Sequence, residues 1–393
     1  MKHCFPYRQI GDVVSDVITW NPVRDGHNQL IRYIDLSSID QNTKVIHPNE
    51  PIVAREAPSR ARQLVQVGDI LVSTVRPNLN GVATVDEGLD GATASTGFCV
   101  LRPNKRELDE AYLFHWVKTP EFVSDMVRKS TGASYPAVSD RIILESKIPL
   151  PPIAQQKRIA AILDQTEELR SLRRQALGAL DAIVQSIFLE MFGDPVTNPK
   201  KLPLIKLGDL TKISSGSTPS RAVIDNFGGT IPWVKTTEVC GTTILKTEEQ
   251  ITENALRNSS CRIYPAGSIL VALYGQGKTR GRCAILGIDA STNQACGVLL
   301  PQPSYDTRFL FSQLTLAYER LRALGRGGNQ ENLNLGLLSD FVVLLPPISL
   351  QQEFARRVEA IEQLKATHRE SLAQLDALFA SLQHRAFRGE LSP

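Results

Sequence analysis

With 393 residues, of which 42% are hydrophobic and 22% charged, the chain is long enough for two or three domains with packed cores. Its formal net charge of +3 permits nucleic-acid binding without demanding it, because clustering of Lys and Arg matters more than their total. The N-terminus lacks an apolar signal core and no run approaches the roughly 18 apolar residues of a membrane span, so we expect a soluble, cytoplasmic protein.

Residues 1–150 predict a first globular module. Short β-rich runs, such as residues 33–34 and 67–72, are bounded by Gly, Pro, Asn and Asp, which is typical of strands joined by tight turns. A mostly helical segment is expected at residues 110–129, and a last strand at 148–150 leads into a Pro-Pro pair. The pattern indicates an α/β globule.

Residues 151–195 predict a long helix that begins after Pro151 and Pro152. Proline is tolerated at a helix start because its missing amide hydrogen has no partner there in any case. Apolar residues recur three and four apart, so one stripe of the helix can be buried against another helix. Polar residues such as Arg170 and Thr166 interrupt this stripe, and a perfect zipper is therefore not predicted.

The rest of the chain repeats this order, with a second module at residues 196–345 and a second long helix at 346–393. The stretch PPIAQQKRIAAILDQTEELRSLRRQALGALDAIVQSIFLEMF from Pro151 aligns without a gap with PPISLQQEFARRVEAIEQLKATHRESLAQLDALFASLQHRAF from Pro346. The offset is 346 − 151 = 195 residues. Self-similarity at so long a period indicates a tandem duplication of a domain-sized unit.

Neither helix is expected to be stable with its apolar stripe in water, so the simplest partner for each is the other. The fold class predicted is α+β, with two similar globular modules that are each followed by a long helix. The residues predicted to pack across the helix pair are Ile159, Leu163, Leu180, Val184, Ile187, Phe354, Val358, Leu375, Phe379 and Leu382.

Two loops differ between the modules although their positions match. STVRPNLNG (residues 73–81) corresponds to ALYGQGKTRG (272–281), and TGASYPAVS (131–139) corresponds to RGGNQENLN (326–334). A shared scaffold that carries divergent polar loops is typical of two binding modules with different targets.

The duplicated sequence resembles the specificity subunit of Type I restriction-modification systems over essentially its whole length. The resemblance rests on the twice-repeated PP-I-x-x-Q helix start, the long helix after each and the globule before each. It implies that the globules are two target recognition domains, each reading one half of a split DNA sequence. It also implies an antiparallel coiled coil of the two helices, with pseudo-twofold symmetry, that fixes the half-site separation. The family usually has an acidic residue before the helix-start glutamine, where this chain has Gln155 and Leu350.

The resemblance also implies the partners: double-stranded DNA, two modification (methyltransferase) subunits and two restriction (endonuclease/translocase) subunits. S-adenosylmethionine, ATP and Mg would serve those subunits, and no cofactor is expected in this chain. Independently of the resemblance, two unlike modules on a rigid rod would act as a caliper for two unlike DNA half-sites, as dimer geometry does in simpler DNA-binding proteins.

Base edges and phosphates are read by Arg, Lys, Asn, Gln and Ser side chains on loops that enter the grooves. In the first module the residues predicted to contact DNA are Arg76, Asn78, Asn80, Ser134 and Tyr135. In the second module they are Lys278, Thr279, Arg280, Arg282, Asn329, Gln330 and Asn332. For each residue the competing interpretation is a solvated or turn-forming loop, in which Asn and Gly supply backbone geometry alone.

Other chemistries fit the sequence less well. Residues 272–279 loosely match a phosphate loop, but such a loop needs a helix at Lys278 and Thr279, and the sequence that follows predicts a strand. A stand-alone DNA adenine methyltransferase would need an Asn/Asp-Pro-Pro-aromatic run and a Gly-rich turn, which the sequence lacks. The six cysteines form no CxxC pair, so we expect reduced thiols rather than a zinc site. A scaffold that binds protein only remains a further alternative.

Overall fold

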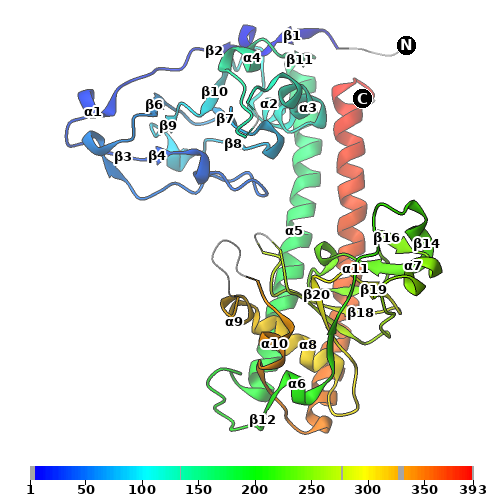
Figure 1. Cartoon of the computed structure of the whole chain (residues 1–393). Helices are drawn as coiled ribbons and strands as arrows, with labels where there is room; N and C mark the ends of the chain where they lie inside the picture. Colours follow the sequence, from blue (N-terminus) through cyan, green and yellow to red (C-terminus); the bar gives the residue numbers. More distant parts are fainter. Residues whose placement is uncertain (1–4, 133, 276–277, 326–331, 392–393) are drawn as a thin grey trace. The chain divides into compact units, whose positions relative to one another are not determined.

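The computed structural model describes residues 5–132, 134–275, 278–325 and 332–391. The chain forms two compact units, Met1–Arg174 with Glu370–Pro393, and Gln175–Arg369 (Figure 1). Each unit holds one globule together with part of each long helix. The predicted boundaries at residues 150, 195 and 345 follow the order of elements along the chain, whereas the packing joins pieces of both helices to each globule.

Both long helices form where the repeated sequence predicts them. Helix α5 spans Ile153–Phe192 and helix α11 spans Ile348–Phe387, and each contains 40 residues without a break. At 1.5 Å per residue each is about 60 Å long. Their equal length and matching ends reflect the 195-residue duplication.

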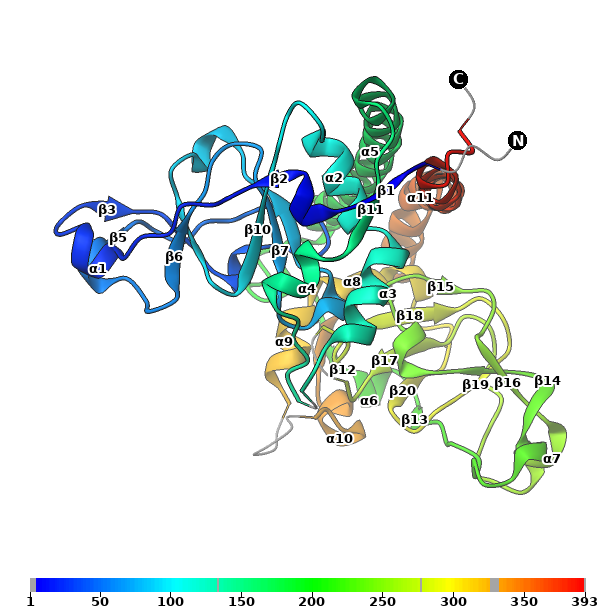
Figure 2. The same cartoon turned by 90° about the horizontal axis from the view of Figure 1, so that it is seen from above.

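The globule of the first unit is built from small, mainly antiparallel sheets. Its strands are β1 (Tyr7–Gln9), β2 (Val14–Ser15), β3 (Leu30–Ile31), β4 (Tyr33–Ile34), β5 (Ile52–Val53), β6 (Ala61–Leu64), β7 (Ile70–Ser73), β8 (Val82–Thr84), β9 (Thr93–Ser95), β10 (Phe98–Pro103) and β11 (Lys147–Pro149). The four-stranded sheet has the order β2-β10-β7-β8 and the three-stranded sheet the order β4-β9-β6, in which β4 and β9 are parallel. In Figure 2, β3, β5 and the short helix α1 (Pro22–Asp25) lie at the end of the globule opposite α2 (Glu110–Val117).

Strand β7 is covered on both faces, which explains its continuous apolar run. Because successive side chains of a strand point to opposite faces, Ile70 and Val72 enter one core while Leu71 enters another. The first of these cores also receives Ile159 and Leu163 of α5. The central sheet is thereby joined to the long helix within one continuous core.

The helical segment predicted at residues 110–129 is two helices, α2 and α3 (Pro120–Lys129). The Thr119 hydroxyl oxygen accepts a hydrogen bond from Phe122 N, and Pro120 occupies the first turn of α3, where it cannot continue the preceding helix. The second unit likewise has two helices at the matching place, α8 (Thr307–Leu316) and α9 (Tyr318–Ala323).

The globule of the second unit repeats the framework with two changes. Its strands are β12 (Leu204–Lys206), β13 (Ile213–Ser215), β14 (Phe227–Val234), β15 (Thr243–Ile244), β16 (Glu249–Ile251), β17 (Ile269–Ala272), β18 (Cys283–Leu286), β19 (Ser291–Thr292), β20 (Cys296–Leu299) and β21 (Val342–Leu344). The main sheet has the order β13-β20-β17-β18-β15, so β15 adds a fifth strand, parallel to β18. The second sheet has the order β16-β14-β19. Its parallel pair β14–β19 matches β4–β9, but the third strand is bound to β14, whereas in the first unit it is bound to β9.

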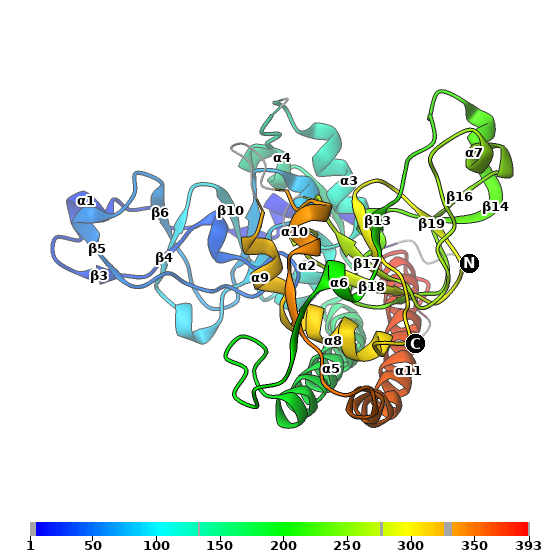
Figure 3. The ribbon, with the colours of Figure 1, turned by 60° about the horizontal axis from the view of Figure 1, so that its bottom comes forward.

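Short helices cap the sheets of both globules. They are α4 (Asp140–Leu144) in the first unit, and α6 (Leu207–Leu210), α7 (Glu253–Arg257) and α10 (Leu335–Ser339) in the second. Figure 3 shows α7 with β14 and β16 at one end of the second globule and α8 beside the long helices. Contacts of Phe309 in α8 with Phe188 and Phe354 agree with that placement.

A buried glutamine attaches each globule to its own long helix. Gln156 Oε1 accepts a hydrogen bond from Asp109 N at 2.9 Å, and its Nε2 donates to the carbonyl oxygens of Glu107 and Pro151, both at 2.8 Å. These bonds satisfy backbone groups at the start of α2 that the fold removes from water.

The second unit makes the same joint 195 residues later. Gln351 Oε1 accepts from Asp306 N at 2.9 Å, and its Nε2 donates to the Pro346 carbonyl oxygen at 2.7 Å. Asp109 and Asp306 are the N-cap residues of α2 and α8, so the glutamine joins each long helix to the start of a helix in the globule that precedes it. The repeated PP-I-x-x-Q sequence therefore encodes a helix–globule joint.

Candidate nucleic-acid interface

The two loops predicted to read DNA in the first module, residues 74–81 and 131–139, lie side by side. Val138 N donates a hydrogen bond to the Thr74 carbonyl oxygen at 2.9 Å, which holds the second loop along the end of β7. Within the first unit the fold therefore brings these loops to one surface.

Arg76 and Tyr135 meet on that surface. The Arg76 guanidinium lies 4.8 Å from the centre of the Tyr135 ring, and 69% of the Tyr135 side chain is exposed. Arg76 and Asn80 both adopt left-handed backbone angles, with φ of 50° and 46°. Such angles are unfavourable for residues with side chains and gather at functional sites. Asn78 and Ser134 are exposed beside them.

A third segment, which the sequence analysis missed, supports this surface. Lys44 Nζ donates to the Asn80 carbonyl oxygen at 2.5 Å, and Lys44 is also left-handed, with φ of 61°. Burial lowers the pKa of Lys44, while nearby Asp40 opposes that change. Asp40 accepts hydrogen bonds from the backbone nitrogens of Asn42 and Thr43, which fixes the turn. No local pattern in the sequence predicts the contact between Lys44 and Asn80, which are 36 residues apart.

A cavity of about 270 Å³ opens between these three segments. Its lining contains both apolar and polar side chains. The lining residues are Leu36, Ser37, Gln41, Ser73, Val75, Arg76, Leu79, Gly81, Phe98 and Tyr135. Gln41 and Ser37 are exposed, so they join Arg76 as polar groups available to a ligand.

In the second unit, the described ends of the equivalent loops are joined by a matching bond. Leu333 N donates to the Leu273 carbonyl oxygen at 2.9 Å, which matches the bond between Val138 and Thr74 in the first unit. Asn332 is half-buried next to this bond. The other two predicted amides, Asn329 and Gln330, lie outside the described residues.

The basic loop of the second unit is tied to α9. The Tyr318 hydroxyl donates to the Lys278 carbonyl oxygen at 2.8 Å and accepts a hydrogen bond from Arg322 at 2.8 Å. This contact leaves the Lys278 side chain exposed. The other predicted residues of this loop are partly exposed: Thr279, Arg280 and Arg282.

The arrangement around Lys278 and Thr279 is that of a turn between strands. Residues 278–280 form a turn, and β18 follows antiparallel to β17. The first turn of a helix, which a phosphate loop uses to bind its ligand, is replaced here by a strand.

No cluster of three metal-binding side chains occurs among the residues that the structure describes. Cys99, Cys261, Cys283 and Cys296 are buried free thiols and Cys240 is an exposed one. Burial raises the pKa of Cys283 to about 12, so this thiol stays protonated.

The predicted helix-seam residues fall into two groups. Those near the helix ends belong to apolar cores: Ile159, Leu163, Phe379 and Leu382 in the first unit, and Val184, Ile187, Phe354 and Val358 in the second. Leu180 and Leu375, nearer the middle, are only half-buried. Three residues that the apolar periodicity did not identify are more deeply buried than Leu180 and Leu375: Phe188, Phe192 and Phe387. They are buried because each globule covers a second stripe of the helices.

By length and hydropathy, α5 alone among the described helices could cross a membrane, with a mean hydropathy of 1.2 over its most apolar 18 residues. A helix of this hydropathy was not expected from the sequence, in which we predicted no membrane span. In the fold, Phe188 and Phe192 of this helix are buried in a protein core, and Asp181 forms an ion pair with Lys365 at 2.7 Å. These contacts weigh against a lipid-facing helix.

The family described as Type I restriction modification DNA specificity domain matches this chain twice, at residues 37–179 and 199–377. Its two matches begin in the two globules and extend into the two long helices. The duplication seen in the sequence is thus a duplication of this domain.

Relatives resemble the chain over most of its length. It is 21% identical to the HindI specificity subunit of the Type I restriction enzyme of Haemophilus influenzae, covering 89% of this chain and 92% of that one. It is 21% identical to the MjaIX specificity subunit of Methanocaldococcus jannaschii, covering 76% and 73%.

Solved structures share the fold. An S subunit of a Type I restriction-modification system from M. genitalium matches with a TM-score of 0.58 at 13% identity, covering 98% of this chain and 97% of that one. A chain from a structure of type I R-M system assembly matches with a TM-score of 0.54 at 24% identity, covering 99% of each chain.

Proposed function

The chain belongs to the Type I restriction modification DNA specificity family, and from this premise we propose that it reads a split, asymmetric DNA target for a Type I restriction-modification complex. Each globule would read one half of the target, and the long helices would span the unread gap. The chain itself is a noncatalytic subunit that directs adenine methylation or cleavage by its partners.

The observation that carries the proposal is the repeated loop pair. Both units hold two polar loops together through the same backbone bond, from Val138 to Thr74 and from Leu333 to Leu273. The loops share position and differ in sequence, STVRPNLNG against ALYGQGKTRG. Two loop pairs that are joined by an equivalent bond and differ in sequence suit two unlike half-sites.

The chemistry of the loops suggests how each half-site is read. In the first unit Arg76 suits the O6 and N7 acceptors of guanine, and Asn78 suits adenine. The exposed Gln41 across the cavity adds a second amide. In the second unit the basic loop around Lys278 suits phosphates, which position the duplex, while Asn332 suits a base edge.

The partners we propose are double-stranded DNA, two modification subunits and two restriction subunits. S-adenosylmethionine, ATP and Mg would act in those subunits, which supply methyl transfer and cleavage. A chain with this role works beside the genome, in the cytoplasm. The rival, a stand-alone adenine methyltransferase, lacks support because the sequence has no Asn/Asp-Pro-Pro-aromatic run.

Genome-wide adenine methylation tests the proposal in cells that carry the cognate modification subunit, with and without this chain. We expect a motif of two short unlike halves around a fixed gap, present only with the chain. Arg76→Ala should relax one half of the motif and Arg280→Ala the other half. Methylation that does not depend on the chain would favour the protein-only scaffold.

Matched controls come from exposed arginines away from the loops. Arg24 and Arg257 form surface ion pairs with Asp25 and Glu253, and the side chain of each arginine is 76% exposed. Alanine at either position should leave both halves of the motif unchanged. A variant of Arg76 that altered both halves equally would contradict the assignment of one globule to one half-site.

A further inference from the structure

An ion pair joins the two long helices in the first unit, between a mostly buried cation on α5 and an exposed acid on α11, whose side chains are 17% and 46% exposed. Arg170 Nε of α5 lies 2.6 Å from Asp376 Oδ1 of α11, and its Nη1 lies 2.6 Å from Glu167 Oε2. One cation is thus shared between an acid on its own helix and an acid on the other helix.

The second unit contains the same arrangement at the 195-residue offset. Lys365 Nζ of α11 lies 2.7 Å from Asp181 Oδ1 of α5 and 2.7 Å from Glu362 Oε1, and its side chain is 7% exposed. Subtracting 195 from 365 and from 362 gives 170 and 167, and adding it to 181 gives 376. The duplication has preserved all three charges, although Arg has become Lys or the reverse.

These ion pairs lie where the apolar contact between the helices is thinnest. In the first unit the core includes α5 residues as far as Leu163, and in the second unit it begins on α5 at Val184. Leu180, between those limits, is half-buried. The middle of each helix therefore depends more on charge than on hydrophobic packing.

Charge discriminates between registers where Leu, Ile and Val do not. In the middle of the helices, an apolar seam alone would tolerate sliding because one aliphatic side chain replaces another, whereas a mostly buried cation moved away from its carboxylate is unfavourable. Positions three, four or seven residues from Asp376 hold no acid: they are Arg369, Leu372, Ala373, Phe379, Ala380 and Gln383.

The same holds around the second aspartate. Positions three, four or seven residues from Asp181 also hold no acid: they are Arg174, Leu177, Gly178, Val184, Gln185 and Phe188. A slide in either direction would thus leave Arg170 and Lys365 without a partner on the opposite helix. A slide of seven residues in one direction would place a cation against each.

We propose that Arg170–Asp376 and Lys365–Asp181 are positioning residues that select a single register of α5 and α11 and so fix the unread gap of the DNA target. This proposal rests on the proposed function, in which the helices span that gap. A slide of one helical turn is about 5.4 Å and a base pair rises about 3.4 Å, so a lost register would change the gap by one or two base pairs.

The first test replaces both ion pairs with leucine: Arg170→Leu, Asp376→Leu, Lys365→Leu and Asp181→Leu together, in the full chain with its modification subunit. Apolar replacement of an ion pair that is removed from water commonly preserves folding, and in each pair here the cation is the less exposed partner. We expect methylated motifs with two or more gap lengths in place of one. Wild-type methylation at one unchanged gap would overturn the proposal.

The second test uses charge reversal. Asp181→Lys alone should reduce methylation at least tenfold, and adding Glu362→Lys with Lys365→Glu should restore it to within twofold at the wild-type gap. Failure of the triple reversal to restore methylation would count against the proposal. Glu253→Arg with Arg257→Glu, an exposed ion pair within α7, is the control and should have no effect.

A readout without DNA separates this proposal from the proposed function. Spin labels at Leu169→Cys and Leu378→Cys, which are exposed on α5 and α11 of the first unit, report the distance between the helices. The background is Cys4→Ser with Cys240→Ser. One distance in the parent chain and several in the four-leucine variant support the register role, even if the chain directs no methylation. A single shared distance contradicts it.

Discussion

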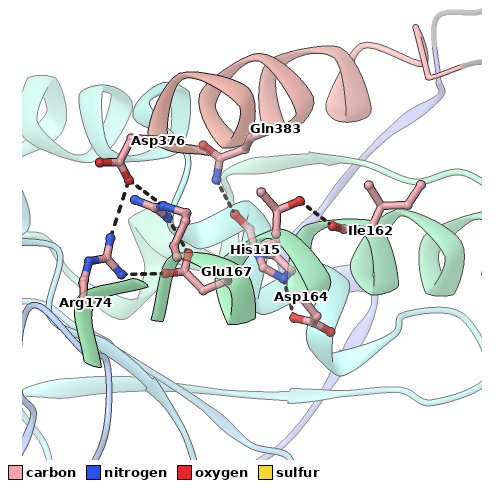
Figure 4. Close-up of polar contacts among 9 residues, drawn as sticks. His115, Ile162, Asp164, Glu167, Arg174, Asp376 and Gln383 are labelled. Carbon is pink, nitrogen blue, oxygen red and sulfur yellow. Dashed lines mark hydrogen bonds and ion pairs between the residues drawn. The ribbon is translucent and has the colours of Figure 1, made fainter. Parts of the chain in front are cut away.

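In each unit a globule is attached to the two long helices, but the side chains at this joint differ in polarity between the two units. In the first unit His115 of α2 is buried with its Nε2 2.7 Å from Asp164 Oδ1 of α5 (Figure 4). Gln383 Nε2 of α11 donates to the His115 carbonyl oxygen at 3.4 Å. Beside the aromatic contacts of Phe387 with α2, this joint therefore contains a polar network with titratable groups.

The second unit fills the matching place with aromatic rings. The residue equivalent to Gln383 at the 195-residue offset is Phe188, and its ring stacks on Phe309 of α8 at 5.7 Å. Phe192 packs on the same ring at 4.8 Å, and Phe354 lies 5.6 Å from Phe188. Aligning the N-caps Asp109 and Asp306 places Ser312 at the position of His115.

The comparison separates two tasks within one joint. The buried glutamine, Gln156 or Gln351, satisfies backbone groups and has been retained in both units. The side chains that pack near this glutamine only have to fill space, so they have diverged. They form a polar network in the first unit and an apolar cluster in the second. The stability of the polar network in the first unit depends on pH, whereas the stability of the aromatic cluster in the second unit depends on close packing.

The largest expected effect is in the aromatic joint. Phe192→Ala removes a fully buried ring that contacts Phe188, Phe309 and Phe354, so the free energy of unfolding of the second unit should fall by about 3–5 kcal/mol. Hydrogen exchange resolved by peptide should show the loss in α8 and spare α2. The equivalent Phe387→Ala, which removes contacts with Tyr112 and Trp116, should reverse this pattern.

A smaller effect is expected from the glutamines that both joints share. Gln156→Ala removes three hydrogen bonds and leaves buried backbone groups unsatisfied, which should cost the first unit about 2–3 kcal/mol. Gln351→Ala removes two, so the second unit should lose less. Urea unfolding followed by peptide-resolved exchange measures both. Equal losses in the two units would mean that the extra bond to Glu107 contributes nothing.

Much of this arrangement follows from local sequence signals. The 195-residue repeat locates both long helices, both glutamines and the polar loops of each globule, because each of these is recognised from residues close together in the chain. The break between α2 and α3 also has a local cause, Thr119 followed by Pro120, so the sequence contains the signal although the predicted helix ran through it.

What the sequence did not indicate depends on contacts between distant segments. Periodicity identified the stripe with Ile159 and Leu163 but not Phe188 or Phe387, since only the folded globule shows that a second stripe is covered. The Lys44 contact with Asn80 and the position of Gln41 beside Arg76 arise in the same way.

The smallest expected effect concerns acid sensitivity of the polar joint. Burial lowers the pKa of His115, against the opposing effect of its hydrogen bond with Asp164. Lys118 opposes protonation further, while Glu167 favours it. His115 Nδ1 is buried without a hydrogen-bond partner among the described residues, so a proton there would gain no acceptor.

The sign of this acid effect follows from the difference between the pKa of His115 in the unfolded chain and its pKa in the fold. His115 has an ordinary pKa of 6.5 in the unfolded chain and a lower one in the fold, so the unfolded chain binds more protons as the pH falls below 6.5. The first unit should therefore lose stability in that range, by at most about 1.4 kcal/mol per pH unit.

Hydrogen exchange of α2 at pH 7.5 and pH 5.5, corrected for intrinsic rates, measures this loss, with α8 as the internal reference because Ser312 does not titrate there. His115→Gln keeps a donor for Asp164 and should remove the difference between the units. If the variant still loses stability in acid as the parent does, a group other than His115 causes the acid sensitivity of the first joint.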